Sequence, residues 1–219
     1  MSRRLVLGGT ALAAAATLTL TPASASASPA SVAAALAPAE ASAPGKVANK
    51  LFRAWLAADR PAAAKVAVPA AVNTIFTYVY RAPDRFDGCS GNVCRFVHTS
   101  VRVPGGLNGI AMVVTGSKVT KVYLSRHIVK PSTVAKHLLA AWKRGDRYSG
   151  LEVGSVGAVK TLFRVRYDPH GVTHYFQGCS KEPKGYSCAY SYEGGAMLMH
   201  VRGSKTTGYE VRSITYIAD

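Results

Sequence analysis

Acidic residues are scarce in this chain of 219 residues. It has 11 Asp and Glu against 27 Lys and Arg, so the formal net charge at pH 7 is +16. Charged residues of either sign make up only 17% of the chain, whereas hydrophobic residues make up 48%. Such a composition is typical of a globular protein and excludes a charge-rich disordered polymer, a collagen and a long coiled coil. The length is that of one or two domains.

Motifs of the familiar enzyme classes are missing as well. The chain contains no Gly-x-Ser-x-Gly elbow, no phosphate-binding loop, no Gly-x-Gly-x-x-Gly and no His-Glu-x-x-His. It also has no Asn-x-Ser/Thr site. We therefore assign no catalytic, cofactor-binding or metal-binding residue, and we expect a protein that is not an enzyme.

The first 27 residues have the pattern of a signal peptide. Arg3 and Arg4 form a basic start, residues 5–20 are weakly apolar, and Ala25-Ser26-Ala27 is a small-x-small cleavage pattern. A membrane anchor is the alternative, but 16 residues interrupted by glycine and threonine are too short for a bilayer span of roughly 20. We expect cleavage near Ala27 and a secreted protein.

The route of export stays open between two alternatives. Ser2 to Leu7 resembles a twin-arginine signal, which carries folded cargo, but two arginines also occur in ordinary signal peptides. No cysteine follows the cleavage site, which argues against a lipoprotein anchor. Cleavage removes two basic and no acidic residues, so the mature chain would carry a formal charge of +14.

Residues 28–46 consist mostly of Ala, Pro and Ser. They offer few large apolar side chains for burial, which predicts a flexible linker. We expect the folded part of the chain to begin near Val47.

The folded part contains the same unit twice. A shift of 87 positions brings residues 47–76 onto 134–163 with 12 identities in 30, where unrelated sequences would give about two or three. Beyond an insertion, Phe86–Cys89 matches Phe176–Cys179, and Ala111-Met112 matches Ala196-Met197. We predict two repeats, residues 47–128 and 134–219, joined by a short linker at 129–133. The identical residues of the first copy are Val47, Ala48, Leu51, Ala54, Trp55, Asp59, Arg60, Val66, Ala71, Val72, Thr74 and Phe76.

Each repeat has helices followed by strands. Apolar residues recur at helical spacing from Val47 to Ala58 and from Val134 to Gly145, where the glycine indicates a helix end. Shorter helices are expected near 69–77 and 156–164, the second with Ser155 as its N-cap, and Ser132 is a candidate cap in the linker. The remainder predicts an α+β fold: two tandem repeats, each with helices packed on one face of an antiparallel sheet. The expected strands are Arg95–Val103, Ile110–Thr115, Val119–Ser125, Ala196–Arg202 and Glu210–Ile217.

The first helix of each repeat ends in a short motif, Ala58-Asp59-Arg60 or Gly145-Asp146-Arg147. An apolar helix with this ending, followed by strands, resembles the nuclear-transport-factor-two-like and cystatin-like superfamilies and is similar to such units in secreted actinobacterial proteins. The resemblance implies a curved sheet around helices with a cone-shaped pocket. It also implies an alternative function, small-molecule binding or an isomerase-like activity in that pocket.

The four cysteines occupy matched positions in the two repeats. Four cysteines allow three connectivities, and an exported protein is expected to be oxidised. We favour local pairing, Cys89 with Cys94 and Cys179 with Cys188, because both repeats keep the arrangement despite different loop lengths. The spacings do not match a pair of Cys-x-x-Cys zinc knuckles.

Several polar residues could carry chemistry, and each has a plainer interpretation. Asp168, His170 and His174 could bind a metal, but Pro169 and Gly171 favour a solvated turn. Asp59 and Asp146 could act as general bases, but an Asp at this place more often caps the next helix. His98 and Glu193 lie in strand-like segments and have no match in the other repeat. Trp55 and Trp142 are expected in the core.

The excess of basic side chains is the remaining signal. Alternation in Phe163–Tyr167 and Val101–Val103 would place arginines on the exposed side of strands. We expect a secreted, non-enzymatic protein whose basic surface binds anionic cell-wall polymer or a membrane surface; nucleic acid is a less favoured partner, since there is no Lys/Arg block. A basic surface without a partner is the plainer alternative, and any small-molecule ligand stays unidentified. The scattered basic residues are Arg81, Arg85, Arg95, Arg102, Lys118, Lys121, Arg126, Lys130, Arg164, Arg166, Arg202, Lys205 and Arg212.

Overall fold

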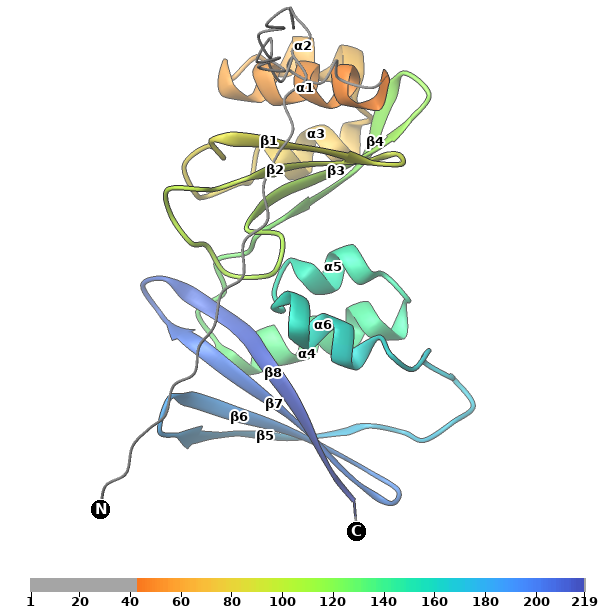
Figure 1. Cartoon of the computed structure of the whole chain (residues 1–219), viewed down its shortest axis with the longest axis vertical. Coiled ribbons are helices and arrows are strands. Elements are labelled where there is room, and N and C mark those ends of the chain that lie inside the picture. Colours follow the sequence, from red (N-terminus) through yellow and green to blue (C-terminus); the bar gives the residue numbers. More distant parts are fainter. Residues whose placement is uncertain (1–42, 219) are drawn as a thin grey trace, which may run out of the picture. The chain divides into compact units, whose positions relative to one another are not determined.

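The computed structural model describes residues 43–218 (Figure 1). The predicted signal peptide, residues 1–27, and most of the predicted linker lie outside these residues. Helix α1 (Ala43–Leu56) begins four residues before Val47, so residues 43–46 belong to the first helix and not to a linker.

Three helices precede four strands in each repeat. The first contains α1, α2 (Arg60–Val66), α3 (Pro69–Ile75), β1 (Arg85–Ser90), β2 (Val93–Val97), β3 (Gly109–Thr115) and β4 (Lys118–Leu124). The second contains α4 (Pro131–Lys143), α5 (Arg147–Leu151), α6 (Val156–Leu162), β5 (Tyr175–Glu182), β6 (Gly185–Tyr192), β7 (Gly195–Ser204) and β8 (Gly208–Ala218). Both sheets are antiparallel, in the orders β1-β2-β3-β4 and β5-β6-β7-β8. The predicted α+β fold of two tandem units is confirmed.

The two Asp residues of the repeated motif start the second helix of each repeat. The Asp59 carboxylate accepts a hydrogen bond from the Ala62 N–H at 2.8 Å, and Asp146 accepts one from Ser149 N–H at 3.0 Å. Each satisfies an amide that the first turn of a helix leaves without a partner. The capping interpretation of these residues is therefore confirmed.

The preceding helices end in a left-handed residue. Gly145 has φ of 67°, as expected for the end of α4, whereas its counterpart Ala58 has φ of 54° and carries a side chain there. The predicted cap at Ser155 is confirmed, since its hydroxyl accepts from Ala158 N–H at 3.1 Å. The predicted cap at Ser132 is wrong, because α4 begins one residue earlier with Pro131 after Lys130.

Each repeat buries its own core between its helices and one face of its sheet. Leu51 and Leu138 are fully buried, and Val72 and Val159 are nearly so. Trp142 is buried and Trp55 half-buried, both packed on these cores as predicted. The repeat therefore preserves one packing solution, which is sensitive to changes of a single methylene group.

The strand predictions are partly wrong. β2 ends at Val97, so residues 98–103 do not form a strand, and residues 163–167 follow α6 as irregular chain. The arginines of both segments are consequently not on strands. The register also places Met112 opposite Cys94 and Met199 opposite Cys188. Ala111-Met112 thus corresponds to Leu198-Met199, two residues beyond the match read from the sequence.

The cysteines of each repeat face each other across a β-hairpin. Cys89 on β1 pairs with Cys94 on β2, and Cys179 on β5 pairs with Cys188 on β6. A disulfide joins each pair. The bridges therefore lie within the repeats and not between them.

Both repeats belong to a single compact unit and share an interface. Tyr148 and Leu151 of α5 pack on the outer face of the first sheet, where the Tyr123 and Tyr148 rings stack with centroids 5.6 Å apart. The Tyr123 hydroxyl donates to Asp146 at 3.1 Å, and the Leu107 N–H donates to the Leu151 carbonyl at 3.1 Å. The first sheet is therefore covered on both faces.

Candidate functional site

The histidine predicted in a strand-like segment, His98, lies in the interior. It is 3% exposed, and its Nε2 lies 2.7 Å from the hydroxyl of buried Tyr78. Burial lowers the pKa of His98 and keeps the ring neutral at pH 7. Glu193, the other such residue, lies exposed in the turn between β6 and β7.

The Asp168–His174 segment is not a uniformly solvated turn. Asp168 accepts a hydrogen bond from the His170 N–H at 2.9 Å, and both residues are exposed. His174 instead packs half-buried between the rings of Trp142 and Tyr192, at 5.3 and 5.1 Å, and burial lowers its pKa. Within residues 43–218, no three His, Cys, Asp or Glu side chains gather in a way that could hold a metal ion.

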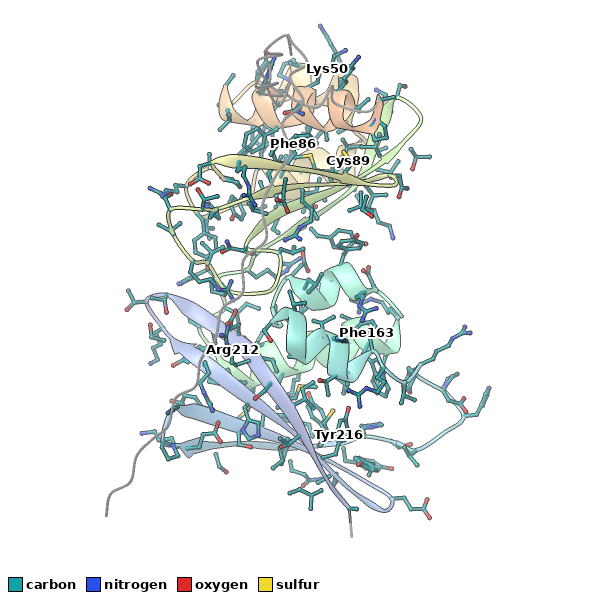
Figure 2. All side chains as sticks on the ribbon, viewed as in Figure 1. Lys50, Phe86, Cys89, Phe163, Arg212 and Tyr216 are labelled. Carbon is teal, nitrogen blue, oxygen red and sulfur yellow. A yellow bond between two sulfur atoms is a disulfide. The ribbon has the colours of Figure 1, made fainter. Side chains whose placement is uncertain are left out.

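A cavity of about 650 Å³ lies where α4 and α6 end in the second repeat. Its walls carry four cations and three aromatic rings, and no Asp, Glu or His is among its lining residues. Phe163, at the end of α6, is labelled in Figure 2. The lining residues are Trp142, Lys143, Arg144, Gly145, Phe163, Arg164, Val165, Arg166, Tyr167 and Pro169. We call this the cationic cavity.

Helix geometry explains why cations gather at this place. Lys143 and Arg144 end α4, and Arg164 follows the end of α6. Carbonyl groups at the C-terminus of a helix carry partial negative charge, which stabilises cations there. Gly145 then turns the chain away with a positive φ.

The aromatic residues hold the basic segments in position. The Trp142 Nε1–H donates to the Val165 carbonyl at 2.8 Å, which fixes the backbone between Arg164 and Arg166. Trp142 meets Tyr167 edge-on at 5.0 Å, and Lys143 Nζ lies 5.5 Å from the centre of the Tyr167 ring. The faces of these aromatic rings thus contact side chains of the protein itself. The rings therefore hold the cationic side chains in position.

None of these four cations forms an ion pair with a described residue, in contrast to several basic residues elsewhere in the fold. Arg126 pairs with Glu152, and both Arg102 and Arg212 pair with Glu210. The four cavity cations are exposed, and Arg144 alone makes a side-chain hydrogen bond, to Ser149 Oγ at 3.3 Å. Their charge is therefore available to a ligand.

The other repeat provides an internal comparison. Counting back 87 residues, the aromatic residues Trp142, Phe163 and Tyr167 correspond to identical residues, Trp55, Phe76 and Tyr80. The cations correspond to neutral residues, and these are Leu56, Ala57, Thr77 and Val79. Aligning the repeats for charge as well as for identity would have singled out these four cations, although not the cavity that they line. Without that alignment, Arg164 and Arg166 look like scattered basic residues, and Lys143 and Arg144 do not stand out.

Comparisons of this chain with protein-family models, with curated proteins and with solved structures give no match. The resemblance to nuclear-transport-factor-two-like and cystatin-like units therefore stays a prediction. None of the helices within residues 43–218 combines the length and hydrophobicity that crossing a bilayer requires.

Proposed function

We propose that the protein is exported and binds an anionic polymer of the cell envelope through the cationic cavity, without catalysing a reaction. The observation that supports this most is the set of four cations without ion pairs, Lys143, Arg144, Arg164 and Arg166, around one cavity. Guanidinium groups form paired, charge-assisted hydrogen bonds with phosphate and carboxylate. A volume of about 650 Å³ suits a ligand group of sugar-phosphate size.

The charge of the whole chain supports the same proposal. A formal charge of +14 after cleavage attracts polyanions over a long range and speeds their encounter with the protein. The cavity would supply the local contacts that a diffuse basic surface lacks.

Export is part of the proposal. Two disulfides per chain are typical of proteins that fold in an oxidising compartment. Together with the pattern of residues 1–27, they favour the cell envelope or its exterior as the place where the anionic partner is met.

The alternative, an isomerase-like enzyme with a cone pocket, requires a group that can transfer protons at its site. Asp, Glu and His residues do this most often, and none lines the cationic cavity. His98 and Glu152, whose pKa values are shifted, are buried elsewhere. The cavity geometry favours binding over acid–base catalysis.

The test replaces the four cations by the residues of the first repeat: Lys143→Leu, Arg144→Ala, Arg164→Thr and Arg166→Val. Binding of inorganic polyphosphate and of polygalacturonate is measured by calorimetry at low and physiological salt. We expect at least a tenfold loss of affinity, equivalent to about 1.4 kcal/mol, because each lost charge-assisted hydrogen bond contributes about 1.5–3 kcal/mol.

The matched control removes the same net charge from exposed positions of the first repeat: Lys50→Gln, Arg53→Gln, Lys65→Gln and Lys121→Gln. We expect the control to weaken binding less than about threefold, because distant exposed charges are largely screened. Equal losses in the two variants would contradict a specific site. No binding of either polymer by the wild-type protein at low salt would overturn the proposal.

A further inference from the structure

The final strand of the second sheet, β8, is an edge strand of eleven residues (Figure 1). Its first half is covered, because Ser155 N–H donates to the Val211 carbonyl and Val211 N–H donates to the Val153 carbonyl, both at 2.9 Å. The Ser155 hydroxyl also donates to the Arg212 carbonyl at 2.7 Å. Beyond Arg212, no described residue pairs with the open side of the strand.

The uncovered half, Ser213–Ala218, has the sequence Ser-Ile-Thr-Tyr-Ile-Ala. It contains no charged residue and no proline, and most of its residues are β-branched or aromatic. Edge strands are ordinarily protected against pairing by charge, proline, a bulge or shortness. The β8 bulge, opposite His200 and Val201, lies in the covered half of the strand and does not protect this segment.

The other three edges of the two sheets carry such protection. β1 contains Arg85 and Asp87 and β5 contains Lys181 and Glu182, and each has a register shift. The edge strand β4 has seven residues with two lysines, and Val68 N–H donates to the Val119 carbonyl on its open side. The C-terminal half of β8 is thus the exception among four edges.

Large apolar side chains flank this open edge on both faces of the sheet. Tyr216, labelled in Figure 2, is 50% exposed, and the adjacent Ile217 is 52% exposed. Neighbouring residues on a strand point to opposite faces, so a strand added here would cover apolar surface on both sides.

We propose that Ser213–Ala218 pairs in antiparallel fashion with the same segment of a second copy of the chain, joining two second-repeat sheets into one. A second copy is the favoured occupant because Ser213–Ala218 is uncharged and can pair with itself, whereas the formal charge of +14 opposes contact between copies elsewhere on the chain. Contact between copies is therefore least opposed at an uncharged segment. A two-fold pairing also brings each apolar residue against an identical segment.

The size of the contact sets the expected strength. Six residues at about 3.4 Å each give a ladder roughly 20 Å long, which is less than the contact of a standard stable dimer. The pairing is accordingly reversible and depends on concentration.

The pairing would also increase the affinity for the proposed polymer. This one consequence rests on the proposed function. Helix α6, whose end borders the cationic cavity, packs against β8. A pair joined along β8 would hold two cationic cavities on one assembly, and two linked sites bind a polymer more tightly than one.

The test is sedimentation velocity of the wild-type protein from about 10 µM to 1 mM, without any polyanion. We expect a dimer fraction that rises with concentration. Ile217→Lys should raise the dimer dissociation constant at least tenfold, because the two-fold arrangement brings the added charges close together. Val79→Lys, at a 70% exposed site of the first repeat, should leave it unchanged within twofold.

Hydrogen exchange locates the contact. In the wild-type protein, the amides of Ser213–Ala218 should exchange more slowly as the concentration rises, while those of β1 stay unchanged. A wild-type monomer at 1 mM would overturn the proposal, and so would a dimer whose exchange at Ser213–Ala218 does not change. Because no ligand is used, failure here leaves the proposed function standing, and failure of polymer binding leaves the pairing standing.

Discussion

Replacing Glu152 by glutamine should weaken the joint between the two repeats. This carboxylate is 2% exposed at the end of α5 and receives hydrogen bonds from the first repeat. Leu124 N–H donates to Oε1 at 3.1 Å, and the Arg126 guanidinium donates to both oxygens, at 2.9 and 3.1 Å. His137 Nε2 lies 3.1 Å from Oε2. Glutamine has nearly the same size and shape as glutamate, so the substitution removes the charge without opening a cavity.

The expected loss follows from the burial of this ion pair. Removing one partner of a buried pair costs about 3–5 kcal/mol. The Arg126 side chain is 44% exposed, so water screens part of the interaction and the low end applies, about 3 kcal/mol. Glu193→Gln in an exposed turn is the matched control and should change stability by less than about 0.5 kcal/mol.

The dependence on pH gives a second measurement. Burial alone would raise the pKa of Glu152, but hydrogen bonds from His137, Arg126 and Leu124 outweigh it and hold the pKa below its ordinary value of 4.5. The unfolded chain therefore takes up the proton first as the pH falls. The stabilisation is fully present above the unfolded value and is lost as the pH falls through the folded value.

The assay is denaturant unfolding of wild-type, Glu152→Gln and Glu193→Gln proteins with disulfides intact, at about pH 7 and at steps down to about pH 3. We expect the difference between wild type and Glu152→Gln to be largest near neutrality and to shrink on acidification. A difference below about 1 kcal/mol at pH 7, or one that grows as the pH falls, would contradict a stabilising role for the Glu152 charge.

Three further outcomes are expected. Ala58→Gly should stabilise the protein and Gly145→Ala should destabilise it, each by about 0.5–1 kcal/mol. The effect is no larger because the strain of a side chain in the left-handed region is partly offset by the greater entropy that glycine gives the unfolded chain. Thermal unfolding that gives the same sign for both variants would contradict this. N-terminal sequencing of protein from culture medium should begin near Ser28, and intact Met1 on membrane-bound material would count against export and cleavage. Peptide mapping without reduction should link Cys89 to Cys94 and Cys179 to Cys188, and a link between the repeats would disprove local pairing.

The repeat could be found from the sequence because many of its identities fall on buried positions. Leu51 and Leu138, for example, are both fully buried. Helix periodicity and the Asp59 and Asp146 caps are local signals, so they locate the helices to within a few residues. These signals act between neighbours in the chain, where elementary stereochemistry decides the conformation.

Features that depend on contacts distant in sequence could not be predicted. The outer face of the first sheet has Val93, Val113 and Tyr123 where the register of the second places Ser187, His200 and Thr215. Helix α5 covers the outer face of the first sheet, so apolar residues suit that face. The difference between the two repeats can therefore be explained only once this packing is known.

The cationic cavity could not be predicted for the same reason. Its basic residues come from the ends of two helices about 20 positions apart, and only the fold brings Lys143 and Arg164 to one wall. The prediction of a solvated loop is wrong for His174 because the rings that bury it, Trp142 and Tyr192, are distant in sequence.

The most direct test of the central claim is to map where a short anion binds. Tripolyphosphate is titrated into isotope-labelled protein at physiological salt, and amide shifts are followed residue by residue. We expect saturable shifts at residues 143–145 and 163–167, with little change at the matched neutral positions 56–58 and 76–80. Shifts of equal size in both repeats, or shifts that never saturate, would contradict a binding site in the second repeat.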